Sequence, residues 1–368
     1  MKYYIHITGC QFNEWDGARI HHIFDALNLE ESSPEDADII VILACAVRQT
    51  AIHRILGKIN DWKKLSDDKK IVVTGCVLES DKKVFKNKGI EIIKAGDDKT
   101  LLKTIGKNLK SISKLSKDTP DIGYVPIING CNNFCSYCAV PYTRGREKSR
   151  PLTEIVNDVL ALIKKGHHEI MLLGQNVNSY KITSTKVSPN SIGSPLIVNS
   201  RLLGNDSKKD FTILLEKLNE LDGDFIISFV SSHPKDMSID TIEAVATLPK
   251  IKKEIHLPLQ SGSNKILKAM NRSYTKSKYL KIIDSIKKIS KRYKTDIIIS
   301  TDFIVGFPGE NEKDFQETVE VMKKVNYKYA FINKYSPRAG TKAYELGDPI
   351  PWSEKQRRWK ILNDISNN

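Results

Sequence analysis

Long apolar runs are absent from this sequence. No stretch of its 368 residues approaches the roughly 20 consecutive apolar residues that a membrane-spanning helix needs. The opening MKYYIHITGC runs straight into alternating apolar residues and does not have the pattern of a secretory signal. We therefore expect a cytoplasmic protein that does not contact a membrane and whose thiols stay reduced.

Cysteine is also scarce. Six cysteines are too few for a disulfide-stapled secreted scaffold or for a string of zinc fingers. Three of them, Cys131, Cys135 and Cys138, form a C-x3-C-x2-C triplet with no fourth cysteine and no histidine nearby. A structural zinc site usually closes with four protein ligands, whereas thiolates also suit iron–sulfur clusters. A four-iron cluster on three thiolates keeps one iron open for another ligand.

Positive charge is in excess. The formal net charge is +14, which favours an anionic partner such as nucleic acid. The abundant lysine, asparagine and isoleucine would also fit a genome rich in A and T, so composition alone leaves the question open. Charge beside the triplet is more informative. We expect four basic side chains there to meet RNA phosphates, and a solvated loop is the alternative. They are Arg144, Arg146, Lys148 and Arg150.

Strand and helix patterns alternate along the chain, which favours parallel sheets. In residues 1–105, three apolar strand patterns are each followed directly by a cysteine, namely Cys10, Cys45 and Cys76. The carboxyl ends of parallel strands lie at one edge of a sheet, so these three thiols can converge on one point. The alternative is that they are buried structural thiols, because cysteine outside disulfides is among the most buried residue types.

About six further βα units follow a polar linker at residues 106–123. They predict an incomplete (β/α)6 barrel over residues 124–368, with the cysteine triplet after its first strand, at the face where barrel enzymes place their chemistry. Residues 181–209, rich in Ser, Asn, Thr and Pro, predict a mobile surface loop. The expected fold class is α/β, an open parallel-sheet domain followed by a partial barrel.

The triplet, with Tyr137 before its last cysteine, resembles the signature of the radical S-adenosylmethionine (SAM) enzymes. The resemblance implies that the open iron of a [4Fe–4S] cluster chelates SAM, and that the reduced cluster cleaves SAM to a 5′-deoxyadenosyl radical. It also implies a set of SAM-binding positions in the triplet and at barrel strand ends. These positions are Tyr137, Gly174, Gln175, Asn176, Ser232, Gln260 and Gly306. A plain turn is the alternative for Gly174, Gln175 and Asn176, and an aromatic ring that only covers the cluster is the alternative for Tyr137.

Other motifs narrow the resemblance. The segments ITGCQFNEWDG, LACAVRQTA and TGCVLES resemble the amino-terminal domain of the methylthiotransferases, which carry a second [4Fe–4S] cluster on the cysteines that match Cys10, Cys45 and Cys76. LLGQNVNSY, SSHP, HLPLQSGS and DFIVGFPGE are similar to the tRNA-modifying MiaB branch. That branch adds a methylthio group at C2 of N6-isopentenyladenosine, next to the anticodon.

The resemblance carries further expectations about partners. It implies binding to the anticodon stem-loop of tRNA, a flavodoxin- or ferredoxin-type reductant, a sulfur donor and a monomeric enzyme. Relatives usually end in a small RNA-gripping β-barrel, the TRAM domain, which we expect to be absent here because the sequence stops at ILNDISNN. A radical is needed for this reaction, because no basic side chain of a protein could remove the hydrogen at C2 of an adenine as a proton.

Two other functions stay open at this point. One is another methylthiotransferase, which acts on an aspartate of a ribosomal protein or on threonylcarbamoyladenosine in tRNA, and only a few short motifs argue against it. The other is a non-enzymatic iron–sulfur protein that binds RNA or transfers electrons. That class would explain clusters and charge, but it would not explain a partial barrel with an open iron.

Overall fold

A computed structural model of the chain describes residues 1–47, 49–65, 69–107, 122–183 and 208–367. Its internal contacts divide the chain into two compact units. The first, here called the cysteine unit, comprises Met1–Pro120, Cys131–Arg146 and Ser336–Asp348. The second, the barrel unit, comprises Asp121–Gly130, Glu147–Tyr335 and Pro349–Asn368.

These compact units are not contiguous in sequence, unlike the domains 1–105 and 124–368 that the sequence suggests. The triplet segment 131–146 and the segment 336–348 belong with the amino-terminal sheet, because their side chains pack and hydrogen-bond there. Most of the predicted linker 106–123 and of the predicted loop 181–209 lies outside the described residues.

The cysteine unit contains a five-stranded sheet in the order β2-β1-β3-β4-β5, with every pair parallel. The long central strands are the three that the sequence predicts, and β2 and β5 are short edges. The bounds are β1 Lys2–Ile7, β2 Glu30–Glu31, β3 Ile39–Ala44, β4 Lys70–Gly75 and β5 Glu91–Ile92. The open parallel sheet is thus confirmed.

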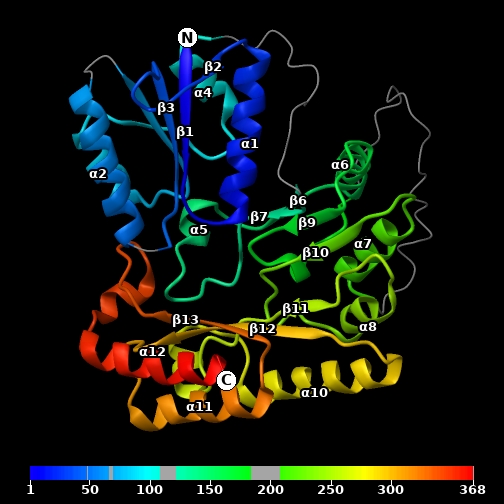
Figure 1. The fold of residues 1–368 in the computed structure, drawn as a ribbon. Coiled ribbons are helices and arrows are strands. Elements are labelled where there is room, and N and C mark those ends of the chain that lie inside the picture. Colours follow the sequence, from blue (N-terminus) through cyan, green and yellow to red (C-terminus); the bar gives the residue numbers. More distant parts are fainter. Residues whose placement is uncertain (48, 66–68, 108–121, 184–207, 368) are drawn as a thin grey trace. The chain divides into compact units, whose positions relative to one another are not determined.

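Helices cover both faces of this sheet (Figure 1). On β3, Ile39, Val41 and Leu43 join a core with α1 (Gln11–Ala26) and α4 (Asp98–Thr104). The alternate residues Ile40, Ile42 and Ala44 join the opposite core, with α2 (Gln49–Leu65) and α3 (Glu79–Asn87). Because both faces are covered, β3 reads as the continuous apolar run IIVILA and not as an alternating pattern.

The barrel unit holds six parallel strands in chain order. They are β6 (Ile122–Pro126), β9 (Glu169–Leu173), β10 (Ile226–Phe229), β11 (Glu254–His256), β12 (Ile298–Val305) and β13 (Tyr329–Lys334). Two three-stranded sheets, β6-β9-β10 and β11-β12-β13, meet where the Lys252 amide donates to the Ile227 carbonyl at 2.9 Å. Within the described ranges β13 and β6 do not pair, so the barrel is incomplete, as predicted.

Among the described residues of this unit, an apolar core lies between these strands and their helices. The helices are α6 Leu152–Lys164, α7 Asp210–Asn219, α8 Ile239–Thr247, α9 Asn264–Ala269, α10 Lys276–Tyr293, α11 Glu312–Val325 and α12 Trp352–Ser366. Short elements complete the fold: β7 Ile128–Asn129 paired antiparallel with β8 Lys148–Ser149, helix α5 Val140–Thr143, and the 3-10 turns η1 Val177–Ser179 and η3 Lys342–Leu346. Among the described helices, none combines the length and the apolar character that a bilayer crossing requires.

Candidate active site

The cysteines of the amino-terminal sheet come together as the strand pattern predicts. Cys10, Cys45 and Cys76 follow β1, β3 and β4, which are neighbours in the sheet. Their thiols are close enough to interact electrostatically. Burial raises the pKa of Cys45, and the Cys76 and Cys10 thiols raise it further. All six cysteines lie among the described residues, and none of them forms a disulfide.

Two glycines allow this approach. The tripeptide Thr-Gly-Cys occurs at residues 8–10 and again at residues 74–76. Gly9 has φ +112°, and a Cβ there would lie 2.7 Å from the Cβ of Cys45. Gly75 has φ +87°, and a Cβ there would lie 2.8 Å from the carbonyl oxygen of Ala44. Both positions require a left-handed backbone and no side chain, which only glycine provides without strain.

Arg144 lies against this trio of thiols and is buried. Its Nε donates to the Sγ of Cys76 at 3.1 Å, and its Nη2 donates to Asn13 at 2.9 Å and to Asp16 at 3.1 Å. The guanidinium also covers the ring of Phe12, with its carbon 4.1 Å from the ring centre. The expectation that Arg144 meets an RNA phosphate is therefore wrong, because its donors are directed into the protein.

A second buried arginine lies beside Cys45. Arg338, from the segment 336–348, donates from Nε to the carbonyl of Ala46 at 2.6 Å and forms a buried ion pair with Asp81. Sequence reasoning missed both arginine pairs. The available signal was the polar pair Asn13 and Asp16, which lies three residues apart on the buried face of α1 just after Cys10.

The triplet follows β7 in a tight loop. Cys131 and Cys135 are buried and Cys138 is partly buried. The Cys138 amide donates to the Cys135 carbonyl at 2.9 Å, and the Cys131 amide donates to Gly145 at 3.2 Å. Between them Phe134 has φ +48°, an uncommon conformation for an aromatic residue that is typical of strained functional loops.

The triplet loop and the trio of thiols belong to one unit. Ala139, directly after Cys138, packs in a small buried cluster with Ala46 and Leu78, and Cys76 lies against the same cluster. Tyr137 is half-buried in the loop. In the described part of the chain, no three His, Cys, Asp or Glu side chains are gathered to hold a single metal ion. A four-iron cluster instead takes one thiolate at each of three irons, so its ligands need not meet at one point.

The other three basic residues of the predicted RNA-binding run differ in exposure. Arg146 and Lys148 are exposed, although Arg146 also stacks on Phe134 at 4.3 Å. Arg150 instead donates to Asp158 at 2.8 Å and to the carbonyl of Pro126 at 2.9 Å. Arg146 and Lys148 thus present their charge to solvent, and neither has a carboxylate partner in the part of the chain that the structure describes.

Unsatisfied polar atoms mark the carboxyl ends of three barrel strands. Among the described residues, six buried side-chain polar atoms lack a hydrogen-bond partner, and five of them belong to the barrel unit. Native proteins leave few buried polar groups without a partner, so such a concentration points to a missing polar ligand. The five atoms are Asn176 Oδ1, Ser228 Oγ, Ser232 Oγ, His233 Nε2 and Gln260 Oε1.

Backbone and protonation support the same location. Ser231 has φ +64° and Gln260 has φ +76°, and such strain clusters at ligand sites. Burial, helped by the charge of Arg272, lowers the pKa of His233 to about 2, so its ring is neutral. The Lys235 amide donates to Nδ1 at 3.2 Å, which places the ring proton on Nε2. His233 therefore offers one N–H donor that no group of the described residues accepts.

Three predicted SAM-contacting positions have a different or additional local explanation. Gly174 is required by packing, because a Cβ would lie 2.2 Å from Cγ2 of Ile128. Gln175 accepts a hydrogen bond from the Gly130 amide at 2.6 Å, so its oxygen is already used. Asn176 donates to Asp236 at 2.8 Å but keeps its own oxygen without a partner.

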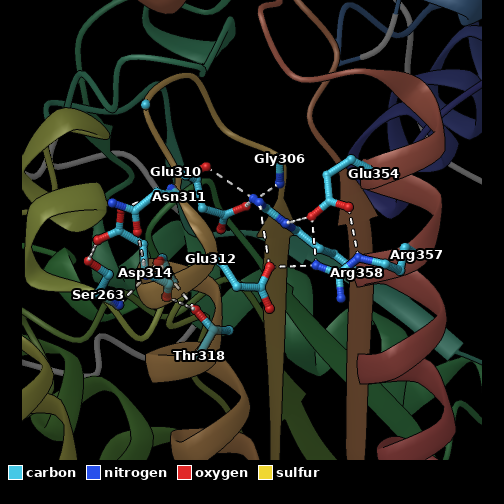
Figure 2. A network of polar contacts seen from close by, with 12 residues as sticks. Ser263, Gly306, Glu310, Asn311, Glu312, Asp314, Thr318, Glu354, Arg357 and Arg358 are labelled. Carbon is cyan, nitrogen blue, oxygen red and sulfur yellow. Dashed lines mark hydrogen bonds and ion pairs between the residues drawn. The ribbon is translucent and has the colours of Figure 1, made fainter.

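Gly306 opens a turn that is fixed from within the protein, as Figure 2 shows. Its amide donates to the Glu310 carboxylate at 2.6 Å, and Arg358 of α12 donates to the same carboxylate at 2.6 Å. Glu310 and Arg358 are both buried. Nearby, Asn311 caps α11 and Ser263 donates to Asp314 at 2.7 Å. The Gly306 amide is therefore satisfied internally, which supports a scaffold role for this turn.

Comparison with known proteins identifies the family. Residues 125–322 match the radical SAM superfamily, and residues 2–94 match Uncharacterized protein family UPF0004. The chain is 37% identical over 388 residues to the tRNA-2-methylthio-N(6)-dimethylallyladenosine synthase of Finegoldia magna, and 38% identical over 390 residues to that of Fusobacterium nucleatum subsp. nucleatum. These alignments cover 99% and 98% of this chain, and 79% and 82% of the relatives. The chain belongs to the family of the tRNA-2-methylthio-N(6)-dimethylallyladenosine synthases.

It is therefore a radical SAM methylthiotransferase, whose chemistry uses SAM and [4Fe–4S] clusters. Its fold agrees with that assignment. The radical S-adenosylmethionine methyltransferase TsrM from Kitasatospora setae superposes with a TM-score of 0.63 at 11% identity, over 93% of this chain and 77% of that one. At this identity the likeness concerns the fold alone, and it extends over sheet and barrel together.

The buried pair at the Gly306 turn generates a stability prediction. Glu310→Gln removes the buried carboxylate of Arg358, which then keeps only the more exposed Glu354, and breaking a buried pair typically costs about 3–5 kcal/mol. Glu312→Gln is the matched control, because Glu312 is exposed, pairs with the exposed Arg357 and reaches Arg358 only at 4.0 Å, so its loss should cost less than about 1 kcal/mol. Denaturant unfolding of the metal-free protein measures both. Equal losses for the two variants would contradict the structural role of the buried pair.

Proposed function

We propose that this protein adds a methylthio group at C2 of N6-isopentenyladenosine, next to the anticodon in tRNA. One observation carries the proposal: all six cysteines lie in one compact unit. The chain is also similar, over nearly its whole length, to enzymes named for that reaction. One thiol triplet meets the need for radical generation, and a second converging trio meets the need for a place to hold sulfur.

We assign the ligands by their positions. Cys131, Cys135 and Cys138 would hold the cluster that binds SAM, and Cys10, Cys45 and Cys76 would hold the auxiliary cluster. When bound, the two groups supply a 5′-deoxyadenosyl radical and a sulfur source for transfer. The protein's part is to bring the thiols of each set together, through the loop geometry at Phe134 and through the glycines before Cys10 and Cys76.

The barrel strand ends would bind SAM. The unsatisfied oxygens of Asn176, Ser232 and Gln260 and the Nε2 donor of His233 can hydrogen-bond its amine, carboxylate and ribose groups. Tyr137 remains a candidate for packing on the adenine, since it is half-buried beside the triplet. Gly174, Gln175 and Gly306 would shape the site through packing and turn geometry. The side-chain oxygen of Gln175 and the amide of Gly306 already bond protein groups, so we do not assign them to SAM.

The substrate and partners follow from this function. A tRNA anticodon stem-loop would meet exposed basic side chains, which include Arg146 and Lys148. Reductive cleavage of SAM requires an electron, for which a flavodoxin- or ferredoxin-type reductant is the proposed source, and each turnover consumes sulfur that a donor must replace. We propose a monomer that acts in the cytoplasm, where its RNA substrate is found.

Mass spectrometry of tRNA nucleosides tests the proposal directly. Cells that lack the family's activity should gain 2-methylthio-N6-isopentenyladenosine when this protein is expressed. A 2-methylthio product on threonylcarbamoyladenosine, or methylthiolation of a ribosomal-protein aspartate with unmodified tRNA, would replace the proposed substrate. No product of any kind from protein with intact clusters would contradict the proposed function.

Two cysteine variants separate the two sets of thiols. Cys76→Ala should abolish methylthio transfer but leave cleavage of SAM to 5′-deoxyadenosine measurable, because radical generation needs only the triplet. Cys135→Ala should abolish both, because it removes one of three ligands of the SAM-binding cluster. Chromatography of 5′-deoxyadenosine and of modified nucleosides gives the two readouts, after circular dichroism has shown that both variants fold. Methylthiolated tRNA from folded Cys76→Ala would show that the assignment is wrong.

RNA binding gives a second prediction. For single-stranded RNA, each phosphate contact contributes about 0.7 to the slope of log affinity against log salt. The double variant Arg146→Gln/Lys148→Gln should therefore lower that slope by roughly 1.4. Arg150→Gln is the matched control with little expected change, since Asp158 already pairs with that side chain. Filter binding of an anticodon stem-loop across salt concentrations measures the slopes, and an unchanged slope in the double variant would remove these residues from the RNA site.

A further inference from the structure

The side chain of Arg144 joins two parts of the cysteine unit that are distant in sequence. It lies six residues after Cys138, so it belongs to the segment that carries the triplet. Its three polar contacts are all made with the amino-terminal sheet domain, to Cys76 at 3.1 Å, Asn13 at 2.9 Å and Asp16 at 3.1 Å. The guanidinium is thus a polar link between the triplet segment and the trio of thiols, and Thr143 of the same segment also bonds the Cys76 thiol.

The burial of this group gives the contact its significance. The side chains of Arg144 and Asp16 are each 4% exposed, so both charges are removed from water. Burying charges is unfavourable unless they are paired and hydrogen-bonded, and Asp16 and Asn13 meet that need at Nη2. The planar guanidinium then directs its remaining Nε donor at sulfur, and the ring of Phe12 closes the other side.

We propose that Arg144 is a positioning residue for the auxiliary site, where it donates a hydrogen bond to the Cys76 thiolate and stabilises the anionic cluster bound there. This inference rests on the proposed function, because it takes Cys76 as a cluster ligand. Hydrogen bonds to cluster sulfurs and nearby positive charge favour the more negative, reduced form, so they raise the reduction potential. Partners outside the ligand sphere also hold metal sites together, and their loss typically lowers metal affinity about 10–100-fold.

Arg338 supplies an internal comparison. It is also buried and has its own carboxylate, Asp81, and its hydrogen bonds within the described residues go to Ala46, Gln49 and Asp81. Its charge acts on the Cys45 thiol, but none of these hydrogen bonds goes to sulfur. Its Nε instead donates to the carbonyl of Ala46 at 2.6 Å. A substitution at Arg338 therefore removes an equivalent buried ion pair without removing a hydrogen bond to sulfur, which separates general damage to the fold from an effect on the cluster.

The experiment uses the full chain with Cys131, Cys135 and Cys138 replaced by alanine, so that only the auxiliary cluster can form. Into this parent we introduce Arg144→Gln, Arg144→Lys and Arg338→Gln. The readouts are a redox titration monitored by electron paramagnetic resonance, and the rate of iron release to a chelator. Arg144→Gln should shift the potential to a more negative value and release iron about 10-fold faster or more.

The comparison variants sharpen the expectation. Arg144→Lys keeps the charge but loses the planar fork, so its potential should lie between those of the parent and Arg144→Gln. Arg338→Gln should shift the potential less than Arg144→Gln. If Arg144→Gln folds poorly, the double variant Asp16→Asn/Arg144→Gln leaves no unpaired buried carboxylate, and its potential should still be more negative than that of the parent carrying Asp16→Asn alone.

Each failure has a distinct signature. A parent that binds no iron would overturn the assignment of Cys10, Cys45 and Cys76, and with it this inference. A parent that binds a four-iron cluster, with an unchanged potential and unchanged iron release in Arg144→Gln, would overturn only the role of Arg144. An equal or larger shift in Arg338→Gln would show that the effect is not directed at sulfur, and would overturn it as well.

Discussion

Parallel pairing of β1, β3 and β4 is the constraint on which the auxiliary site depends. Ile7 pairs with Leu43, and Ala44 pairs with Gly75, so the three strands end nearly in register. Each strand is followed within three residues by a cysteine, and all three cysteines leave the sheet at the same edge. If one strand ran antiparallel, its cysteine would lie at the opposite edge, a full strand length away. The order and direction of the strands thus bring these three cysteines together, whereas in the triplet the short spacing in the sequence does so.

Buried ion pairs then connect other segments to this edge. Arg144 meets Asp16, and Arg338 meets Asp81, across separations of 128 and 257 residues in sequence. Such pairs are a poor general source of stability, because desolvation offsets most of the attraction. Their value here is geometric, since the planar guanidinium directs its donors at defined partners. The segments 131–146 and 336–348 are thereby fixed to the sheet, and both cysteine sets share one unit.

The fold could be predicted from local patterns because the main sheets of both units are parallel. Continuous apolar strands such as IIVILA alternate with amphipathic helices, and the strand order of the barrel follows the chain. The convergence of Cys10, Cys45 and Cys76 followed from the same rule. The division into units could not be predicted this way, because the triplet segment interrupts the barrel sequence and packs elsewhere through side chains whose partners are far away in the chain.

The roles of individual charges were the least accessible to sequence reasoning. Arg144 and Arg146 stand two residues apart in one basic run, yet one is buried on Asp16 and the other is exposed. Composition and spacing do not distinguish them, since burial depends on a helix more than a hundred residues away. At the barrel strand ends, Asn176, Ser232 and Gln260 each have a buried atom without a hydrogen-bond partner among the described residues, whereas the Gly306 amide bonds Glu310. Contact of any of these residues with SAM stays a prediction.

Buried polar atoms that have no hydrogen-bond partner within the described residues lie at the ends of β9, β10 and β11, where we propose that the barrel unit takes a ligand of its own. The central claim, however, is that three plus three cysteines make two separate cluster sites. Iron analysis with Mössbauer spectroscopy of the anaerobically reconstituted chain tests it most directly. The account predicts about eight irons per chain, all in two four-iron clusters. About four irons in a single cluster would show that Cys10, Cys45 and Cys76 are structural thiols and would contradict it.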